Sequence, residues 1–138
     1  MKVVVDTNIW VSLAIGSKSI TYDFFELLNS TNIEFIVCEG LIDEIVATLE
    51  KEKIRNYLSK DRVILLFDIL ENHTSSFISH SKNTFCRDLN DDYLINLAID
   101  SESEILITGD KDLLILNSVE NIKILTIKQL LDFIKKPS

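Results

Sequence analysis

Five acidic residues of this sequence have the types and spacing that metal-assisted chemistry needs. They are Asp6, Glu44, Asp91, Asp92 and Asp110. Carboxylates gathered at one place raise the pKa values of their neighbours, so a cation must neutralise them if they are to stay ionised. Oxygen ligands suit Mg²⁺ or Mn²⁺, and no histidine or cysteine accompanies these acids at the spacing of a zinc site. Such a site can activate water for attack on a phosphodiester, which is nuclease chemistry.

Asp6 is the strongest single candidate. It directly follows the apolar run 3–5 (VVV), and an aspartate that ends a buried strand needs a physical reason. Each of the other acids has a plain structural alternative. Asp91 can serve as a helix N-cap, Asp110 as a turn residue after a glycine, and Glu44 as a solvated helix residue. Only a shared location would make them one site.

Short apolar runs bounded by polar residues predict the strands that would carry these acids. Such continuous runs favour parallel strands that are buried on both faces. The expected strands are Lys2–Asp6, Glu34–Cys38, Glu104–Thr108 and Lys123–Thr126, with one further short strand inside His73–Phe85. Asp6 then ends one strand and Asp110 follows another, and ligands of open α/β sheets bind at the carboxyl ends of the strands.

Apolar residues at helical spacing predict helices between these strands. The expected helices are 9–15, a stretch through 22–28, one opening at Gly40, two within 51–72 with Ser59 as a cap, one capped by Asp91 or Asp92, and Ile127–Lys136. Glu44 lies one turn into its helix, at the border of the apolar stripe. In the last helix Leu130, Leu131 and Ile134 are expected to face inward. Alternating strands and helices without a repeat or linker predict one α/β domain over residues 1–138, with a mostly parallel sheet.

The net charge of -8 argues against attraction to nucleic acid through a basic surface, because that binding comes from lysine and arginine neutralising phosphates. Metal ions held by carboxylates can supply positive charge instead. No apolar run approaches the roughly 20 residues of a membrane span, and Asp6 stands where a signal peptide would continue its apolar region. A cytoplasmic protein is expected. Cys38 and Cys86 have no metal-site spacing and are expected to be buried small hydrophobic residues.

Two other classes of phosphate-handling protein are disfavoured by the residues at the strand ends. A phosphatase of the haloacid dehalogenase type has a second aspartate two residues after the first, where this chain has Asn8. A receiver domain has a lysine at the end of a later strand, where this chain has Thr108 and Thr126.

Four segments resemble, in this order, the motifs of the PIN-domain family: VVVDTNIWVSL, LIDEIVATL, RDLNDDYLINLA and LITGDKDLL. Together they span nearly the whole chain. The resemblance is closest to the branch of toxins from bacterial or archaeal toxin–antitoxin pairs. It implies an α/β/α sandwich with a mostly parallel central sheet, and an endoribonuclease that hydrolyses RNA phosphodiesters with Mg²⁺ or Mn²⁺.

The resemblance also implies roles for individual residues. The metal-binding and catalytic acids would be Asp6, Glu44, Asp110 and one of Asp91 and Asp92, which the sequence does not separate. The supporting polar positions would be Asn8, Thr108 and Asp112. Arg87, beside the third motif, is a candidate for binding the substrate phosphate.

The implied partners are an RNA substrate, an antitoxin protein that covers the site, and a second copy of the chain in a homodimer. A different class of function stays open, namely a catalytically silent PIN-like module that keeps the acids but only binds RNA or protein. Cleavage stimulated by Mg²⁺ or Mn²⁺ distinguishes the enzyme from the binding module.

Overall fold

The structure is a computed structural model that describes residues 1–16, 18–30, 32–79 and 89–135. Its strands are β1 (Lys2–Val5), β2 (Glu34–Val37), β3 (Thr74–Ser76), β4 (Ile105–Ile107), β5 (Ser118–Val119) and β6 (Ile122–Leu125). They form one six-stranded sheet in the order β3-β2-β1-β4-β6-β5. Every neighbouring pair is parallel except β5 with β6. This confirms the predicted mostly parallel sheet.

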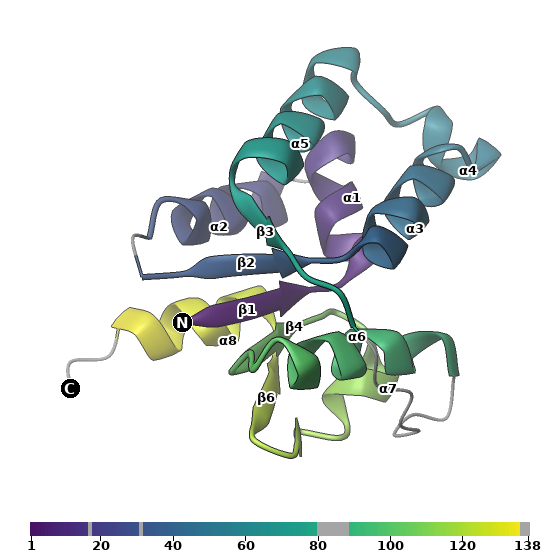
Figure 1. Ribbon diagram of the computed structural model, residues 1–138. Coiled ribbons are helices and arrows are strands. Elements are labelled where there is room, and N and C mark those ends of the chain that lie inside the picture. Colours follow the sequence, from purple (N-terminus) through teal and green to yellow (C-terminus); the bar gives the residue numbers. More distant parts are fainter. Residues whose placement is uncertain (17, 31, 80–88, 136–138) are drawn as a thin grey trace.

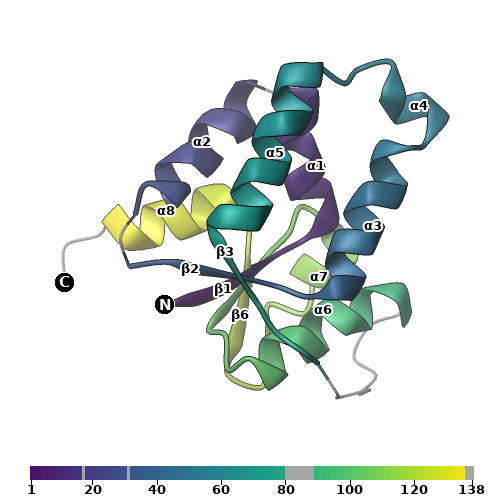
Figure 2. The ribbon, with the colours of Figure 1, turned by 45° about the horizontal axis from the view of Figure 1, so that its top comes forward.

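Helices cover both faces of the sheet. They are α1 (Thr7–Ile15), α2 (Lys18–Leu28), α3 (Glu39–Leu49), α4 (Glu52–Arg55), α5 (Lys60–Asn72), α6 (Leu89–Asp100), α7 (Lys111–Leu114) and α8 (Ile127–Lys135). Figures 1 and 2 show α1, α2 and α5 on one side of the sheet and α6 on the opposite side. On the first side α1 contacts α3 and α5, and α2 contacts α8; on the other, α6 packs on β1 and β4. The layers are therefore α/β/α, as expected.

The central position of β1 follows from its sequence. Val3, Val4 and Val5 are fully buried, and a continuous valine run fits a strand that is covered on both faces. Val4 aligns with Ile36 of β2 on one side and with Leu106 of β4 on the other. The carboxyl ends of these three parallel strands therefore share one edge of the sheet.

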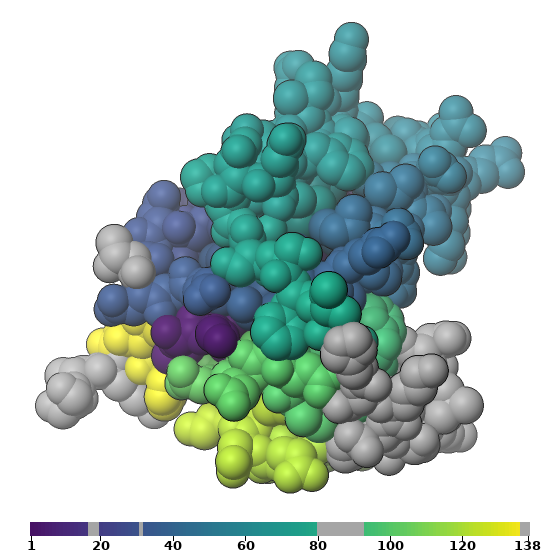
Figure 3. Space-filling view, in the orientation of Figure 1, coloured from purple at the N-terminus to yellow at the C-terminus, as the bar shows by residue number. Residues whose placement is uncertain are grey.

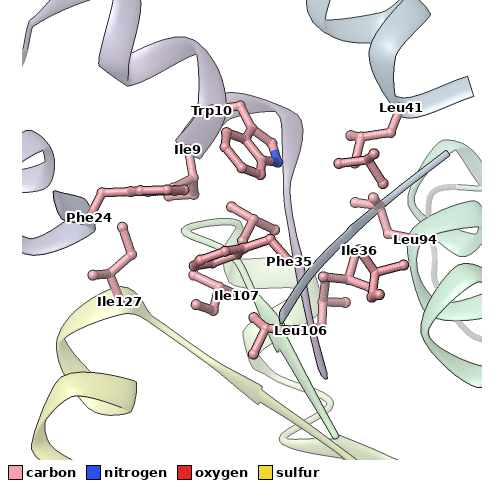
Figure 4. Close-up of a cluster of buried hydrophobic side chains, with 14 of the residues drawn as sticks. Ile9, Trp10, Phe24, Phe35, Ile36, Leu41, Leu94, Leu106, Ile107 and Ile127 are labelled. Atoms are coloured by element: carbon pink, nitrogen blue, oxygen red, sulfur yellow. The ribbon is translucent and has the colours of Figure 1, made fainter. Parts of the chain in front are cut away.

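An aromatic cluster fixes the helix that follows β1 (Figure 4). The ring centroid of Trp10 in α1 lies 4.9 Å from that of Phe24 in α2 and 6.0 Å from that of Phe35 in β2. Tilted and edge-on ring pairs of this kind add to the free energy gained by burial. Because Trp10 is completely buried, α1 is held directly after β1, and the junction residue Asp6 is held with it.

One predicted short strand is confirmed, and one strand was not predicted. The short strand predicted inside His73–Phe85 is Thr74–Ser76, which precedes Phe77 and Ile78 and pairs in parallel with β2. Residues 80–85 of that predicted segment lie outside the described residues. The two-residue strand β5 was not predicted, because so short an element has no periodic signal.

Two side-chain expectations at the ends of elements also need correction. Ser59 occupies the N-cap position of α5, but its side chain makes no capping hydrogen bond. Cys38 is half-buried rather than buried, because it lies past the end of β2, at the N-cap of α3. Cys86 lies outside the described residues.

The last helix packs with a narrower face than expected. Ile127, Leu130 and Leu131 are buried, whereas Ile134 is 39% exposed rather than inward. The inward stripe of α8 therefore ends one turn before the helix does, and the predicted end at Lys136 lies outside the described residues. None of the helices in the described part of the chain is long and apolar enough to cross a membrane.

Candidate functional site

Asp6 lies at the junction of β1 and α1, where it is 7% exposed. Its backbone N–H donates to the carbonyl of Ile107 at 2.9 Å, which extends the β1–β4 pairing by one residue. Although Asp6 is the N-cap of α1, its side chain makes no capping hydrogen bond. Aspartate at this position usually caps the helix with its carboxylate. Here the carboxylate is instead available at the sheet edge.

Thr108 connects two of the candidate acids. Its fully buried side-chain hydroxyl donates to a carboxylate oxygen of Asp6 at 2.6 Å. The same hydroxyl oxygen accepts the backbone N–H of Asp110 at 3.0 Å. Since Thr108 directly follows β4, it holds the end of β1 and the loop after β4 in a fixed relation. Thr108, which was expected to support the acids, thus contacts both Asp6 and the backbone of Asp110.

Asp110 has a structural role as well as a place near Asp6. It is the N-cap of α7, and its Oδ1 accepts the backbone N–H of Asp112 at 2.8 Å. It is also close enough to Asp6 for its charge to raise the pKa of that carboxyl. The capping alternative and the proximity to Asp6 are therefore both true of Asp110, because capping occupies Oδ1 alone. Asp112 contributes its backbone to this turn and is itself exposed.

Glu44 reaches the same edge from α3 and is held there by a tyrosine. The hydroxyl of Tyr93, on α6, donates to Oε2 of Glu44 and lies 3.3 Å from the hydroxyl of Thr7. Thr7 is buried beside Asp6 in the first turn of α1. Helices from opposite faces of the sheet therefore meet at this point, with Tyr93 between them.

The electrostatics of the site centre on Asp6. Its pKa is raised above the ordinary value of 3.8, first because the carboxyl is buried and also because Glu44 and Asp110 carry like charge nearby. The hydrogen bonds from Thr108 and from the backbone of Thr7 act in the opposite direction and do not cancel these effects. A carboxyl in this environment resists ionisation unless a cation is close to it.

Tyr93 is a hydrogen-bond donor rather than an acid in this arrangement. Its pKa is raised above 10.0, first by burial and then by its hydrogen bond to Glu44. The phenol therefore keeps its proton at neutral pH and can hold the Glu44 carboxylate in one orientation. This role of Tyr93 was not predicted. Its only sequence signal is its place directly after Asp91 and Asp92 in the third motif.

The structure gives less information on the other site residues predicted from the sequence. Because α6 begins at Leu89, Asp91 and Asp92 lie within its first turn instead of capping it. Asn8 is exposed on α1, and Arg87 lies outside the described residues. Among the side chains that the structure describes, no three acids, histidines or cysteines form a ready ligand group for one metal ion.

The sequence is similar to a known family and to a known protein. A family model described as the PIN domain matches residues 2–112. Over 115 residues the chain is 33% identical to MJ1680, an uncharacterized protein of Methanocaldococcus jannaschii, and the match covers 83% of this chain and 74% of that protein.

Two solved structures are similar in fold. One is a chain in the crystal structure of VapBC2 from Rickettsia felis bound to a DNA fragment from their promoter, with a TM-score of 0.57 and 17% identity. The match covers 90% of this chain and 97% of that one. The other is the PIN domain of human SMG5, with a TM-score of 0.55 and 12% identity, which covers 98% of this chain and 100% of that domain.

Proposed function

This chain belongs to the PIN-domain family, whose members are generally nucleases, and on that premise we propose that it is a metal-dependent endoribonuclease. The observation that carries the proposal is the place of Asp6, a buried carboxyl at the sheet edge that accepts the Thr108 hydroxyl and lies close to Glu44 and Asp110. Burial and the like charges nearby both disfavour the ionised form of this carboxyl. The arrangement is useful if a divalent cation is bound beside it.

The donor chemistry fits a hard divalent cation. Asp6, Glu44 and Asp110 offer carboxylate oxygens, and Asp91 and Asp92 lie in the first turn of α6. Oxygen ligands of this kind suit Mg²⁺ or Mn²⁺. We propose that Asp6, Glu44, Asp110 and one of Asp91 and Asp92 hold the ion. When bound, it would polarise the scissile phosphate and lower the pKa of a water molecule.

The protein's own contribution is to hold the acids in place. Thr108 holds Asp6 and the backbone of Asp110, and Tyr93 holds Glu44. Hydrogen-bonded partners of this kind orient metal ligands and are nearly as important as the ligands themselves. Burial of Asp6 lowers the local dielectric constant, which strengthens its interaction with any cation that approaches. We propose that Asn8 and Asp112 support the same edge and that Arg87 meets a substrate phosphate.

The same proposal extends to biological role. We propose that the chain is a toxin of a toxin–antitoxin pair, which its similarity in fold to a chain of the VapBC2 complex supports. We further propose that it acts in the cytoplasm as a homodimer. A cognate antitoxin would then cover the acidic site. Expression of the chain alone should slow growth of a bacterial host, and the Asp6→Asn variant should not. Equal growth of the strains that express the parent and Asp6→Asn would contradict the toxin role, but it would not contradict the nuclease proposal.

The ribonuclease proposal is tested by cleavage and melting with the same proteins. The parent should cut an end-labelled single-stranded RNA in millimolar Mn²⁺ or Mg²⁺ and not in EDTA. The ion should also raise its melting temperature, because an ion at about 100 times its dissociation constant stabilises a folded protein by about 2.7 kcal/mol. The double variant Glu44→Gln, Asp110→Asn should lose both effects.

A matched double variant controls for the change in net charge. Glu71→Gln, Asp132→Asn removes the same two charges from exposed positions on α5 and α8, and it should behave as the parent does. Equal metal-induced shifts in all three proteins would show that the ion binds elsewhere. If the ion raises the melting temperature of the parent and the control but not of the acidic-site variant, and no RNA tested is cleaved, the chain is a binding module instead of an enzyme.

A further inference from the structure

A pocket of about 480 Å³ opens beside the acidic site. Its wall runs from Cys38 and Gly40 at the start of α3, through Phe77 and Ile78 after β3, to Tyr93 of α6. Figure 3 shows the teal surface of the β3 segment lying against the green surface of α6. The volume falls within the range of pockets that bind small molecules.

We propose that this pocket binds one nucleobase of the RNA substrate, next to the phosphodiester that is cut. The inference rests on the proposed ribonuclease function and narrows it to single-stranded RNA. A base can enter a side pocket only if it is unstacked and unpaired, and proteins read RNA sequence mainly at such bases.

Tyr93 places the pocket next to the acids. Its hydroxyl contacts Glu44 and Thr7, whereas the same residue also lines the pocket. The acidic edge and the pocket therefore share one residue, Tyr93. A nucleotide whose phosphate meets the acids has its neighbouring base within reach of the pocket.

The chemical character of the pocket suits a base better than a phosphate. Phe77, Ile78 and Tyr93 provide apolar or aromatic surface, and Ile78 is 74% exposed. Bases stack on aromatic and apolar side chains because each base has a flat, uncharged face. Among the described residues of the lining, Glu39 is the one that carries a charge, and it disfavours a second phosphate. The first N–H groups of α3, next to Gly40, have no partner within the helix and can donate to a base edge.

Two other pockets in the described part of the chain fit a base less well. One lies at the amino-terminal edge of β4 and is lined by Glu102, Glu104 and Glu120, whose charges repel RNA. The other lies between α4, α5 and the far end of α3, and includes Leu49 and Phe67. Neither is lined by a residue that contacts the acidic site.

Binding of free nucleosides tests the pocket without requiring catalysis. The probes are adenosine, guanosine, cytidine and uridine, titrated into the ¹⁵N-labelled full chain in EDTA and followed by backbone amide chemical shifts. We expect at least one nucleoside to shift the amides of 76–79 and 38–40. The shifts should saturate, and amides on α5 and α8 should not move.

Two substitutions and one control test the location. Ile78→Ala removes exposed apolar wall and should weaken nucleoside binding at least threefold. Gly40→Ala narrows the pocket, and the fold accepts it because a Cβ there meets nothing nearer than Cys38 Sγ at 4.0 Å. Ile64→Ala makes the same change as Ile78→Ala at a position on α5 that is 59% exposed, and it should bind nucleosides as the parent does.

Cleavage of a randomised RNA pool gives the second measurement. The parent should show a base preference at one position beside the cut, and Ile78→Ala should reduce it while Ile64→Ala retains it. If RNA is cleaved but no nucleoside binds, the proposal of a nucleobase pocket is wrong and the ribonuclease proposal stands. The same conclusion follows if the base preference is unchanged in Ile78→Ala. Saturable nucleoside shifts without any RNA cleavage would support the pocket and refute the nuclease.

Discussion

The hydroxyl of Thr108 donates a hydrogen bond of 2.6 Å to a carboxylate oxygen of Asp6, although 102 positions of sequence separate the two residues. The same hydroxyl oxygen accepts the N–H of Asp110. One buried side chain therefore determines how two acids from different strands lie relative to each other. The contact also opposes the rise in the pKa of Asp6 that burial produces.

Thr108→Val should destabilise the protein by about 1 to 3 kcal/mol, because it leaves a buried acceptor and a buried N–H without their partner. The loss should be larger at pH values where Asp6 is ionised, since hydrogen bonds to a carboxylate are stronger. Urea unfolding at two pH values measures it. Thr108→Ser, which keeps the hydroxyl, should lose much less free energy of unfolding. Equal losses in Thr108→Val and Thr108→Ser would mean that packing of the methyl group dominates.

Asp6→Asn should abolish RNA cleavage, by at least about 100-fold, because loss of even a partner that orients a metal ligand costs about 10- to 100-fold. In the absence of metal it should raise the melting temperature, because the amide removes a buried charge and its repulsion by Glu44 and Asp110. About 1 kcal/mol would correspond to roughly 4 °C in a chain of this size. Asp43→Asn, at an exposed position of α3, should change neither property. A marked fall in the melting temperature of Asp6→Asn would show that Asp6 is structural.

Stability without metal should depend on pH through Asp6. Its carboxyl binds a proton more tightly in the folded protein than in the unfolded chain, whose value is near 3.8. The contribution of Asp6 is therefore fully present below pH 3.8 and is lost as pH rises through the folded pKa. The free energy of unfolding of Asp6→Asn minus that of the parent should grow over this window and then level off. In excess Mn²⁺ the dependence should reverse, since the ion binds ionised carboxylates; a difference that is flat with pH would contradict the raised pKa.

Tyr93→Phe should weaken metal binding by about 10- to 100-fold, the usual effect of losing a partner that orients a ligand. The ring remains, so the nucleobase pocket keeps its wall. Cleavage measured against Mn²⁺ concentration should show a higher half-saturation and a substantial recovery of rate at saturation. Tyr22→Phe, on the exposed surface of α2, is the control. A lower rate at every Mn²⁺ concentration, with unchanged half-saturation, would place Tyr93 in the chemical step instead of in ligand positioning.

Salt dependence should be shallow, because metal ions held by the acidic site would provide the main attraction for the scissile phosphate, and the net charge of the chain is -8. Each neutralised phosphate steepens the dependence of log K on log salt by roughly 0.7 to 0.9, so a slope no steeper than about -3 is expected at fixed metal. Cleavage should also rise with pH. Single-turnover cleavage of labelled RNA at saturating Mn²⁺ measures both. A steep salt slope with a flat pH profile would show that a basic surface carries recognition.

The sequence by itself determined the sheet and the position of Asp6. A run of three valines favours a strand that is buried on both faces, and an aspartate directly after such a strand lies at the carboxyl edge. The same reasoning placed Asp110 at that edge, where its charge is felt by Asp6. These features are local, because periodicity and the order of residue types decide them. The register of α6 was harder to predict, since a helix start has only a weak signal.

Only the tertiary structure showed that Tyr93 holds Glu44. Tyr93 and Glu44 are 49 positions apart and come from helices on opposite faces of the sheet, so no local pattern links them. The hydroxyl of Tyr93 reaches Glu44 because α3 and α6 both approach the carboxyl edge, and their approach depends on the packing of the whole core. The pocket beside Tyr93 has the same origin, since β3 joins the sheet through pairing with β2 and not through any periodicity of its own.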